Sequence, residues 1–105
     1  MSVAEVALRM ATQADAPGMQ VLTATGEIDV TNAVEFTRDL RSRIGDQGAV
    51  LDLTDLDYVG SAGFAALDEL VASCGIRIVL GERSKIRRAA ALISLPFSDS
   101  VAAAT

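Results

Sequence analysis

The chain contains 105 residues, of which 50% are hydrophobic and 4% aromatic, and its formal net charge is −5. This length suits one domain with a core of aliphatic side chains. The acidic balance argues against partners with a phosphate backbone or an anionic membrane surface. The chain has no histidine and one cysteine, Cys74, which excludes an internal disulfide and a Cys/His zinc site.

The first residues lack the basic start and the apolar run of a secretion signal. No stretch approaches the ~18 consecutive apolar residues that a membrane span needs. We therefore expect a cytoplasmic protein, a monomer or a weak dimer, that contacts neither a membrane nor nucleic acid.

Hydrophobic periodicity and turn signals predict the element order strand, strand, helix, strand, helix, strand, helix. The first two strands lie at residues 6–12 and 19–24 and are joined by a Pro-Gly turn at residues 17 and 18. A helix then runs from an N-cap at Thr31 to a C-cap at Gly45, followed by a strand at residues 49–53 and a helix from Ser61 to Gly75. The last two elements are a strand at residues 76–80 and a helix that begins at Ser84 and ends before Pro96.

Strand–helix–strand repeats imply right-handed crossovers and parallel strands. We therefore expect a single α/β domain over residues 1–105, with helices packed on a mixed, mostly parallel sheet of about four strands, one of them antiparallel. The core of this domain covers about residues 6–95. Residues 97–105 give no element, and we expect them to form a frayed tail.

The most distinctive segment runs from Val50 to Phe64 and predicts an apolar strand, a short acidic loop and a Gly-Ser-Ala-Gly turn that opens a helix. The turn places the Ser61 hydroxyl at a helix N-terminus, where free N–H groups and the helix dipole favour negative charge. One interpretation makes Ser61 an N-cap worth ~1 kcal/mol against alanine. The other makes it a phosphorylation site, and the two roles are compatible.

Two short motifs in this order resemble the STAS family, which includes the bacterial anti-sigma factor antagonists. The first is Gly26-Glu27-Ile28-Asp29, and the second joins Leu51-Asp52-Leu53 to Gly60-Ser61-Ala62-Gly63-Phe64. In element order the resemblance covers roughly residues 6–95. It implies a STAS-like fold and a regulatory binding module rather than an enzyme.

The resemblance implies that Ser61 accepts a phosphate from an anti-sigma factor serine kinase. In that scheme the unphosphorylated chain binds the kinase and frees a sigma factor, phosphorylation ends the binding, and a separate metal-dependent phosphatase reverses it. The residues expected at the kinase interface are Glu27, Asp29, Gly60, Ser61, Ala62, Gly63 and Phe64. The chain itself is expected to have no catalytic residue, metal or cofactor.

The sequence departs from the family pattern in two places. Gly60 stands where the family has an acidic residue just before the serine, and the tail is short for the extra strand and long terminal helix of many relatives. Both departures favour an alternative function, an unphosphorylated structural STAS subunit of a larger signalling assembly. The serine itself favours the antagonist.

Other interpretations of the motif residues remain open at this point. Glu27 and Asp29 form either a partner-facing acidic patch or a solvated loop beside a helix N-terminus. Phe64 is expected to face the core, although it could anchor a partner. A serine enzyme is disfavoured because no histidine can activate Ser61 and Val59 breaks the G-x-S-x-G pattern.

The sequence also contains one acidic and one basic cluster of side chains. Asp52, Asp55 and Asp57 offer carboxylates for magnesium, but nothing fixes octahedral geometry, so we expect the two loop residues to be solvated. The basic cluster consists of Arg83, Lys85, Arg87 and Arg88. It forms either a solvated helix face or a contact with an acidic partner.

Overall fold

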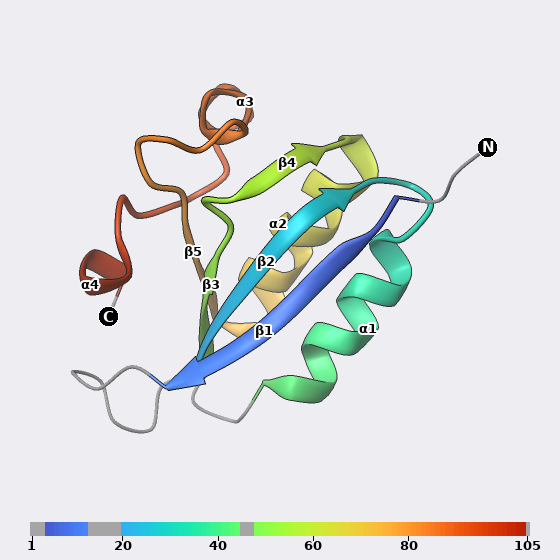
Figure 1. The fold of residues 1–105 in the computed structure, drawn as a ribbon, viewed down its shortest axis with the longest axis horizontal. Helices are drawn as coiled ribbons and strands as arrows, with labels where there is room; N and C mark the ends of the chain where they lie inside the picture. Colours follow the sequence, from blue (N-terminus) through green and yellow to red (C-terminus); the bar gives the residue numbers. More distant parts are fainter. Residues whose placement is uncertain (1–3, 13–19, 45–47, 105) are drawn as a thin grey trace.

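The computed structural model describes residues 4–12, 20–44 and 48–104 of the chain. Its strands are β1 (Val6–Thr12), β2 (Gln20–Ile28), β3 (Ala49–Asp52), β4 (Leu56–Val59) and β5 (Ile76–Val79), and its helices are α1 (Ala33–Arg43), α2 (Ser61–Cys74), α3 (Arg87–Leu92) and α4 (Val101–Ala104). Figure 1 shows one sheet, with α1 and α2 packed along it and with α3 and α4 on the β5 side of the molecule, away from β1. The predicted turn at residues 17 and 18 and the predicted C-cap Gly45 lie outside the described residues.

The sheet has the strand order β1-β2-β3-β5, with β4 paired to β2. The pair β1–β2 is antiparallel, and all other pairs are parallel. Because β3 pairs with the first half of β2 and β4 with its last residues, the two short strands follow one another along one edge of β2. The predicted α/β class and the mixed, mostly parallel sheet are confirmed, with five strands in place of about four.

The additional strand is β4, which the sequence predicts as part of an acidic loop. Its burial pattern does not alternate, because Leu56 and Val59 are buried while Asp57 and Tyr58 between them are exposed. Period-2 alternation is the main sequence signal of a half-buried strand. The strand therefore forms by pairing with a distant partner, β2, and its own sequence carries little sign of it.

Strand β2 also continues four residues beyond its predicted end, through Gly26. Gly26 has a φ of 101°, and the register with β4 shifts between Gly26 and Glu27, as in a β-bulge. A Cβ at this position would lie 2.3 Å from the Glu5 carbonyl oxygen. Glycine thus permits the bulge that carries β2 as far as Ile28.

The main core lies between the sheet and the helices α1 and α2. Its largest fully buried side chains are aliphatic apart from Phe36, as the low aromatic content indicates. The apolar residues Ala33, Phe36, Leu40 and Ile44 recur at intervals of three and four; the first three are buried on the inner face of α1, and Ile44 is its C-cap and packs partly buried against the core. The predicted end of α2 is confirmed, since Gly75 is its C-cap in the left-handed conformation with a φ of 66°.

Helix α3 is shorter than the sequence predicts and begins at Arg87 rather than Ser84. The Ser84 hydroxyl accepts a hydrogen bond from the Ile86 N–H over 3.2 Å, so the chain makes a turn before the helix. The helix ends at Leu92, before Pro96 as predicted, and Ser94 follows with a φ of 61°.

Residues 97–104 pack against the sheet, whereas the sequence indicates no element in this segment. Ser98 exchanges backbone hydrogen bonds with the end of β5, and the Arg77 guanidinium donates to the Ala104 carbonyl over 2.8 Å. Ala104 is buried in a second small core with Val21, Val50 and Val79. Helix α4 thereby covers part of the sheet face opposite α1 and α2, because adjacent strand residues point to opposite faces.

Gly63 in α2 generates a prediction about stability. A Cβ there would lie 2.7 Å from Val59 Cγ1 and 2.8 Å from the Ile28 carbonyl oxygen, closer than such contacts occur. We expect Gly63→Ala to lower the free energy of unfolding by about 1–3 kcal/mol, since overpacking outweighs the better helix propensity of alanine.

Urea unfolding followed by circular dichroism measures this change, with Gly60→Ala as the matched control. A Cβ at Gly60 would meet its nearest neighbours at 3.4 Å, and its φ is −84°. That variant should therefore lose less than about 1 kcal/mol. Equal stability of Gly63→Ala and the wild type would contradict the tight packing of α2 on β2.

Candidate functional site

Ser61 is the first residue of α2, and Gly60 before it is the N-cap. The Gly60 carbonyl accepts the first helical hydrogen bond, from the Phe64 N–H over 3.0 Å. The prediction that Ser61 caps the helix is therefore wrong, because a capping side chain belongs to the residue one position earlier. Ser61 is exposed, and its hydroxyl makes no hydrogen bond with any residue that the structure describes.

The two glycines of the second motif fix the helix start against the sheet. Gly60 is buried, and its N–H donates to the Ile28 carbonyl over 2.8 Å. Gly63 is buried one turn later, against Ile28 and Val59. Both glycines thus hold the backbone that carries Ser61. Because they are buried, they are not themselves accessible to a binding partner.

Asp29 lies beside this helix start, although it is distant in sequence. An ideal Cβ on Gly60 would lie 3.4 Å from the Asp29 Cβ, so the two predicted motifs meet in space. The Asp29 carboxylate accepts hydrogen bonds from the Thr31 N–H at 2.8 Å and from the Thr31 hydroxyl at 2.6 Å. These two bonds, the hydroxyl foremost, hold the pKa of the Asp29 carboxyl below its usual value.

The turn between β2 and α1 is organised by Asn32, which the sequence analysis did not single out. Asn32, not Thr31, is the N-cap of α1, and its side chain makes no capping bond. Its amide oxygen instead accepts from the Asp29 N–H at 3.0 Å, and its amide nitrogen donates to the carbonyls of Ala4 and Glu27. Asparagine is common in turns because its side chain bonds the nearby backbone, but the bond to Ala4, 28 residues earlier, could not be predicted from local sequence.

The remaining predicted contact residues differ in accessibility. Glu27 is exposed at the end of β2 and is paired in register with Tyr58 of β4. Ala62 and Phe64 are half-buried and pack against the main core. The expectation that Phe64 faces the core therefore agrees with its packing, and its ring also lines a shallow hollow with Ser61.

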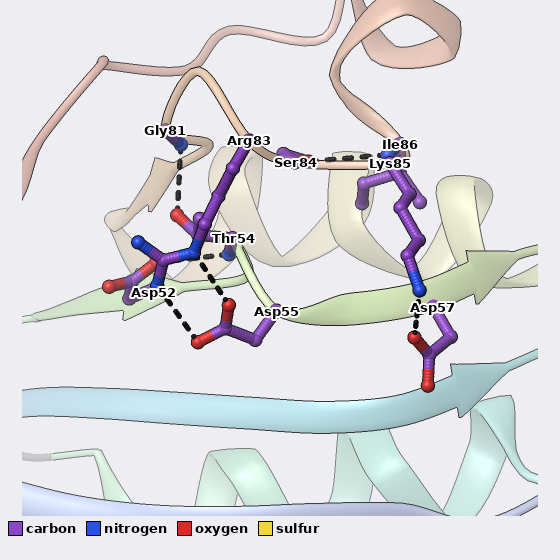
Figure 2. Close-up of polar contacts among 9 residues, drawn as sticks. All are labelled: Asp52, Thr54, Asp55, Asp57, Gly81, Arg83, Ser84, Lys85 and Ile86. Atoms are coloured by element: carbon purple, nitrogen blue, oxygen red, sulfur yellow. Dashed lines mark hydrogen bonds and ion pairs between the residues drawn. The ribbon is translucent and has the colours of Figure 1, made fainter.

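The acidic segment before Ser61 is tied to the chain that follows β5, as Figure 2 shows. Asp55 pairs with Arg83 at 3.0 Å, and Asp57 pairs with Lys85 at 2.8 Å. The pairing lowers the pKa of Asp55 and raises those of Arg83 and Lys85, in each case mainly through the side-chain hydrogen bond. The two aspartates are exposed, as expected of solvated residues, and each is in addition paired with a cation, which the sequence did not predict.

These ion pairs contribute little to the stability of the fold. All four side chains are about half exposed or more, and such pairs are screened by water and salt. A partly buried bond lies beside Arg83, in which the Thr54 hydroxyl accepts from the Gly81 N–H over 2.8 Å (Figure 2). Among the described residues, no group of three or more His, Cys, Asp or Glu side chains is arranged to hold a metal ion.

The fold and the placement of these residues define a small α/β domain whose two sequence motifs meet at the end of β2. The model of the STAS domain family matches residues 11–80, which is 70 of the 105 residues. The chain therefore belongs to the STAS domain family, as its motifs indicate. A comparison with curated protein sequences gave no significant match.

Two of the solved structures with similar folds are the following. One is an anti-sigma factor antagonist from Mycobacterium paratuberculosis, with a TM-score of 0.77 and 22% identity over 95% of this chain and 91% of that one. The other is an uncharacterised protein with a SpoIIAA-like fold from Shewanella loihica PV-4, with a TM-score of 0.55 and 14% identity over 99% and 93% of the two chains. Within the described part of the chain, no helix has the length and apolar character to cross a membrane.

The Asp29 turn generates a prediction about pH. We expect Thr31→Val to raise the Asp29 pKa toward its usual value, because the largest cause of its lowering is the Thr31 hydroxyl. The carboxyl ¹³C chemical shift of Asp29, followed by NMR from neutral to acid pH, measures this change. Asp55 is the internal control, since its pKa is lowered by Arg83 and should not move.

The same variant tests the sign of the stability effect. A carboxyl whose pKa is lowered by folding stabilises the fold above its unfolded pKa and loses that effect as the pH falls through its folded pKa. The stability difference between the wild type and Thr31→Val should therefore be constant near neutral pH and shrink in acid. A difference that stays constant through the acid range would show that Thr31 acts instead through packing or through its bond from the Ala4 N–H.

Proposed function

We propose that this STAS domain is a cytoplasmic anti-sigma factor antagonist that binds an anti-sigma factor serine kinase and is released when Ser61 is phosphorylated. The observation that carries the proposal is the exposed Ser61 hydroxyl at the first position of the 14-residue helix α2, which bonds to none of the residues that the structure describes. The similarity in fold to an antagonist from Mycobacterium paratuberculosis supports the same class of function.

The modification is ordinary phosphoryl transfer. The Ser61 Oγ attacks the γ-phosphorus of ATP on the kinase, the bond to the β-phosphate oxygen breaks, ADP leaves, and a base on the kinase takes the hydroxyl proton. The product adds ~−1.5 to −2 charges and three acceptor oxygens at the start of α2. The free N–H groups and dipole of the helix favour that charge, so the fold tolerates it.

Release follows from the change at the interface rather than from a change in fold. A kinase surface that packs against a neutral hydroxyl must desolvate a dianion after phosphorylation, which is costly without a new cationic partner. Asp29 adds a second negative charge close by, because its lowered pKa keeps it ionised at neutral pH. A separate metal-dependent phosphatase would restore the binding form.

The switch is tested with three immobilised proteins: the wild type, Ser61→Ala and Ser61→Glu. We expect the first two to retain the same kinase from a lysate of the source cell and Ser61→Glu to bind it at least about tenfold more weakly, because glutamate supplies part of the phosphate charge. Binding is measured by biolayer interferometry with the recovered kinase, and phosphopeptide mapping of native protein locates the phosphate. Equal retention by all three proteins, with no phosphate on Ser61, would leave this serine without a switching role.

Gly60 favours a second candidate, an unphosphorylated structural STAS subunit of a larger signalling assembly. A kinase that reads an acidic residue before the serine finds none here. Gly60→Asp distinguishes the two functions. If the recovered kinase phosphorylates the wild type as well as this variant, the antagonist stands; if only Gly60→Asp accepts phosphate and the wild type co-purifies with a stable assembly, the structural role replaces it.

A further inference from the structure

An open groove of about 630 Å³ runs between α1 and α2, beginning next to the proposed switch. Its apolar lining consists mainly of Val30, Val34, Thr37, Ala62, Ala65 and Ala66. Val30 and Val34 are 80% and 68% exposed, among the highest values for large hydrophobic side chains in the described chain. Val30 directly follows Asp29 and Ala62 directly follows Ser61, so the groove adjoins both motif residues.

The small side chains of α2 make this face concave. Alanines form the α2 side, while Val30 and Val34 rise on the α1 side. The Thr37 hydroxyl is occupied by a hydrogen bond to the Ala33 carbonyl at 2.9 Å, which leaves its methyl group for contact. A surface of this kind, flanked by two helices, suits the apolar face of a third helix laid into the groove.

The charged side chains at the rim determine the electrostatic character of the groove. Arg41 is engaged, since its guanidinium bonds Glu69 at 3.4 Å and the Cys74 sulfur at 3.2 Å. Arg38 lies on the same rim, is exposed, and makes no ion pair or hydrogen bond with a residue that the structure describes. With respect to the described part of the chain, Arg38 is therefore the one cation of the groove without an ion pair, in a chain whose net charge is −5.

We propose that the groove between α1 and α2 receives an amphipathic helix of the anti-sigma factor kinase, with an acidic side chain of that helix facing Arg38. This inference rests on the proposed function, and it adds the element by which the partner docks. The groove adjoins both motif residues of the proposed switch, which favours the partner that contacts Ser61 over a second copy of this chain, and the unpaired Arg38 favours an acidic side chain on that partner. The open shape favours a helix over an enclosed small molecule.

Photo-crosslinking tests where the kinase lies. The crosslinking amino acid p-benzoylphenylalanine is placed at Val34 in the groove, at Tyr58 beside Gly60, and at Arg9 on β1 as a remote control; all three side chains are exposed. We expect the kinase to crosslink from Val34 and from Tyr58 and not from Arg9. Mass spectrometry of the Val34 product should map the link to an amphipathic helical segment with acidic residues.

Charge reversal tests the chemistry of the rim with the recovered kinase. We expect Arg38→Glu to weaken binding about tenfold and to reduce its salt dependence, because an attraction becomes a repulsion. Arg9→Glu is the matched control with the same change in net charge and should alter binding by less than about twofold. Circular dichroism and the urea midpoint verify that both variants remain folded.

The outcomes separate this inference from the proposed function. A kinase that crosslinks from Tyr58 but not from Val34, or that binds Arg38→Glu as tightly as the wild type, overturns the groove and leaves the antagonist intact. A Val34 crosslink to a second copy of the chain or to a lipid also overturns the groove. If none of the variants captures a kinase, the antagonist function fails, and the groove proposal fails with it.

Discussion

The candidate site depends on one contact, the docking of the start of α2 against the end of β2. The Gly60 N–H donates to the Ile28 carbonyl at 2.8 Å, and Gly63 packs where a Cβ would overlap Ile28 and Val59. Ile28 is fully buried, so the contact ties the helix to the main core. It also brings the two motifs together, because Asp29 follows Ile28 and Ser61 follows Gly60.

Neighbouring residues at this junction have opposite roles. The glycines are buried and hold the backbone in place, whereas Ser61 between them projects into solvent. A charge added to Ser61 therefore stays in water, next to the favourable end of a helix dipole, and need not enter the core. The physical consequence of modification falls on whatever packs against the surface, which is what a switch between binding states requires.

The parts of this fold that the sequence predicted are those with a local cause. The end of α2 is an example, since Gly75 alone permits the left-handed C-cap, and the inner face of α1 follows from its own periodicity. Strand β4 was missed because its partner is β2, some 30 residues earlier, and two of its four side chains are exposed acidic or polar groups. The role of Asn32 in the turn was not predicted because one of its bonds reaches back to Ala4, 28 residues away. The proximity of Asp29 to Ser61 came from the family resemblance, and only the packing of α2 on β2 gives it a physical cause.

Gly60 changes the electrostatics of the junction as well as its shape. An acidic side chain at this position would start 3.4 Å from the Asp29 Cβ and next to the serine, so phosphorylation would place a third negative group in a small volume. With glycine, a phosphate on Ser61 would meet one acidic group fewer, and the lowered pKa of Asp29 reflects bonds from Thr31 that already disperse part of its charge. The phosphorylated form should therefore be less strained here than in a relative with the acidic residue. The same absence removes a charge by which a kinase could recognise the serine. Under the proposed function, recognition would then rely more on surface farther from Ser61, such as the apolar groove between α1 and α2.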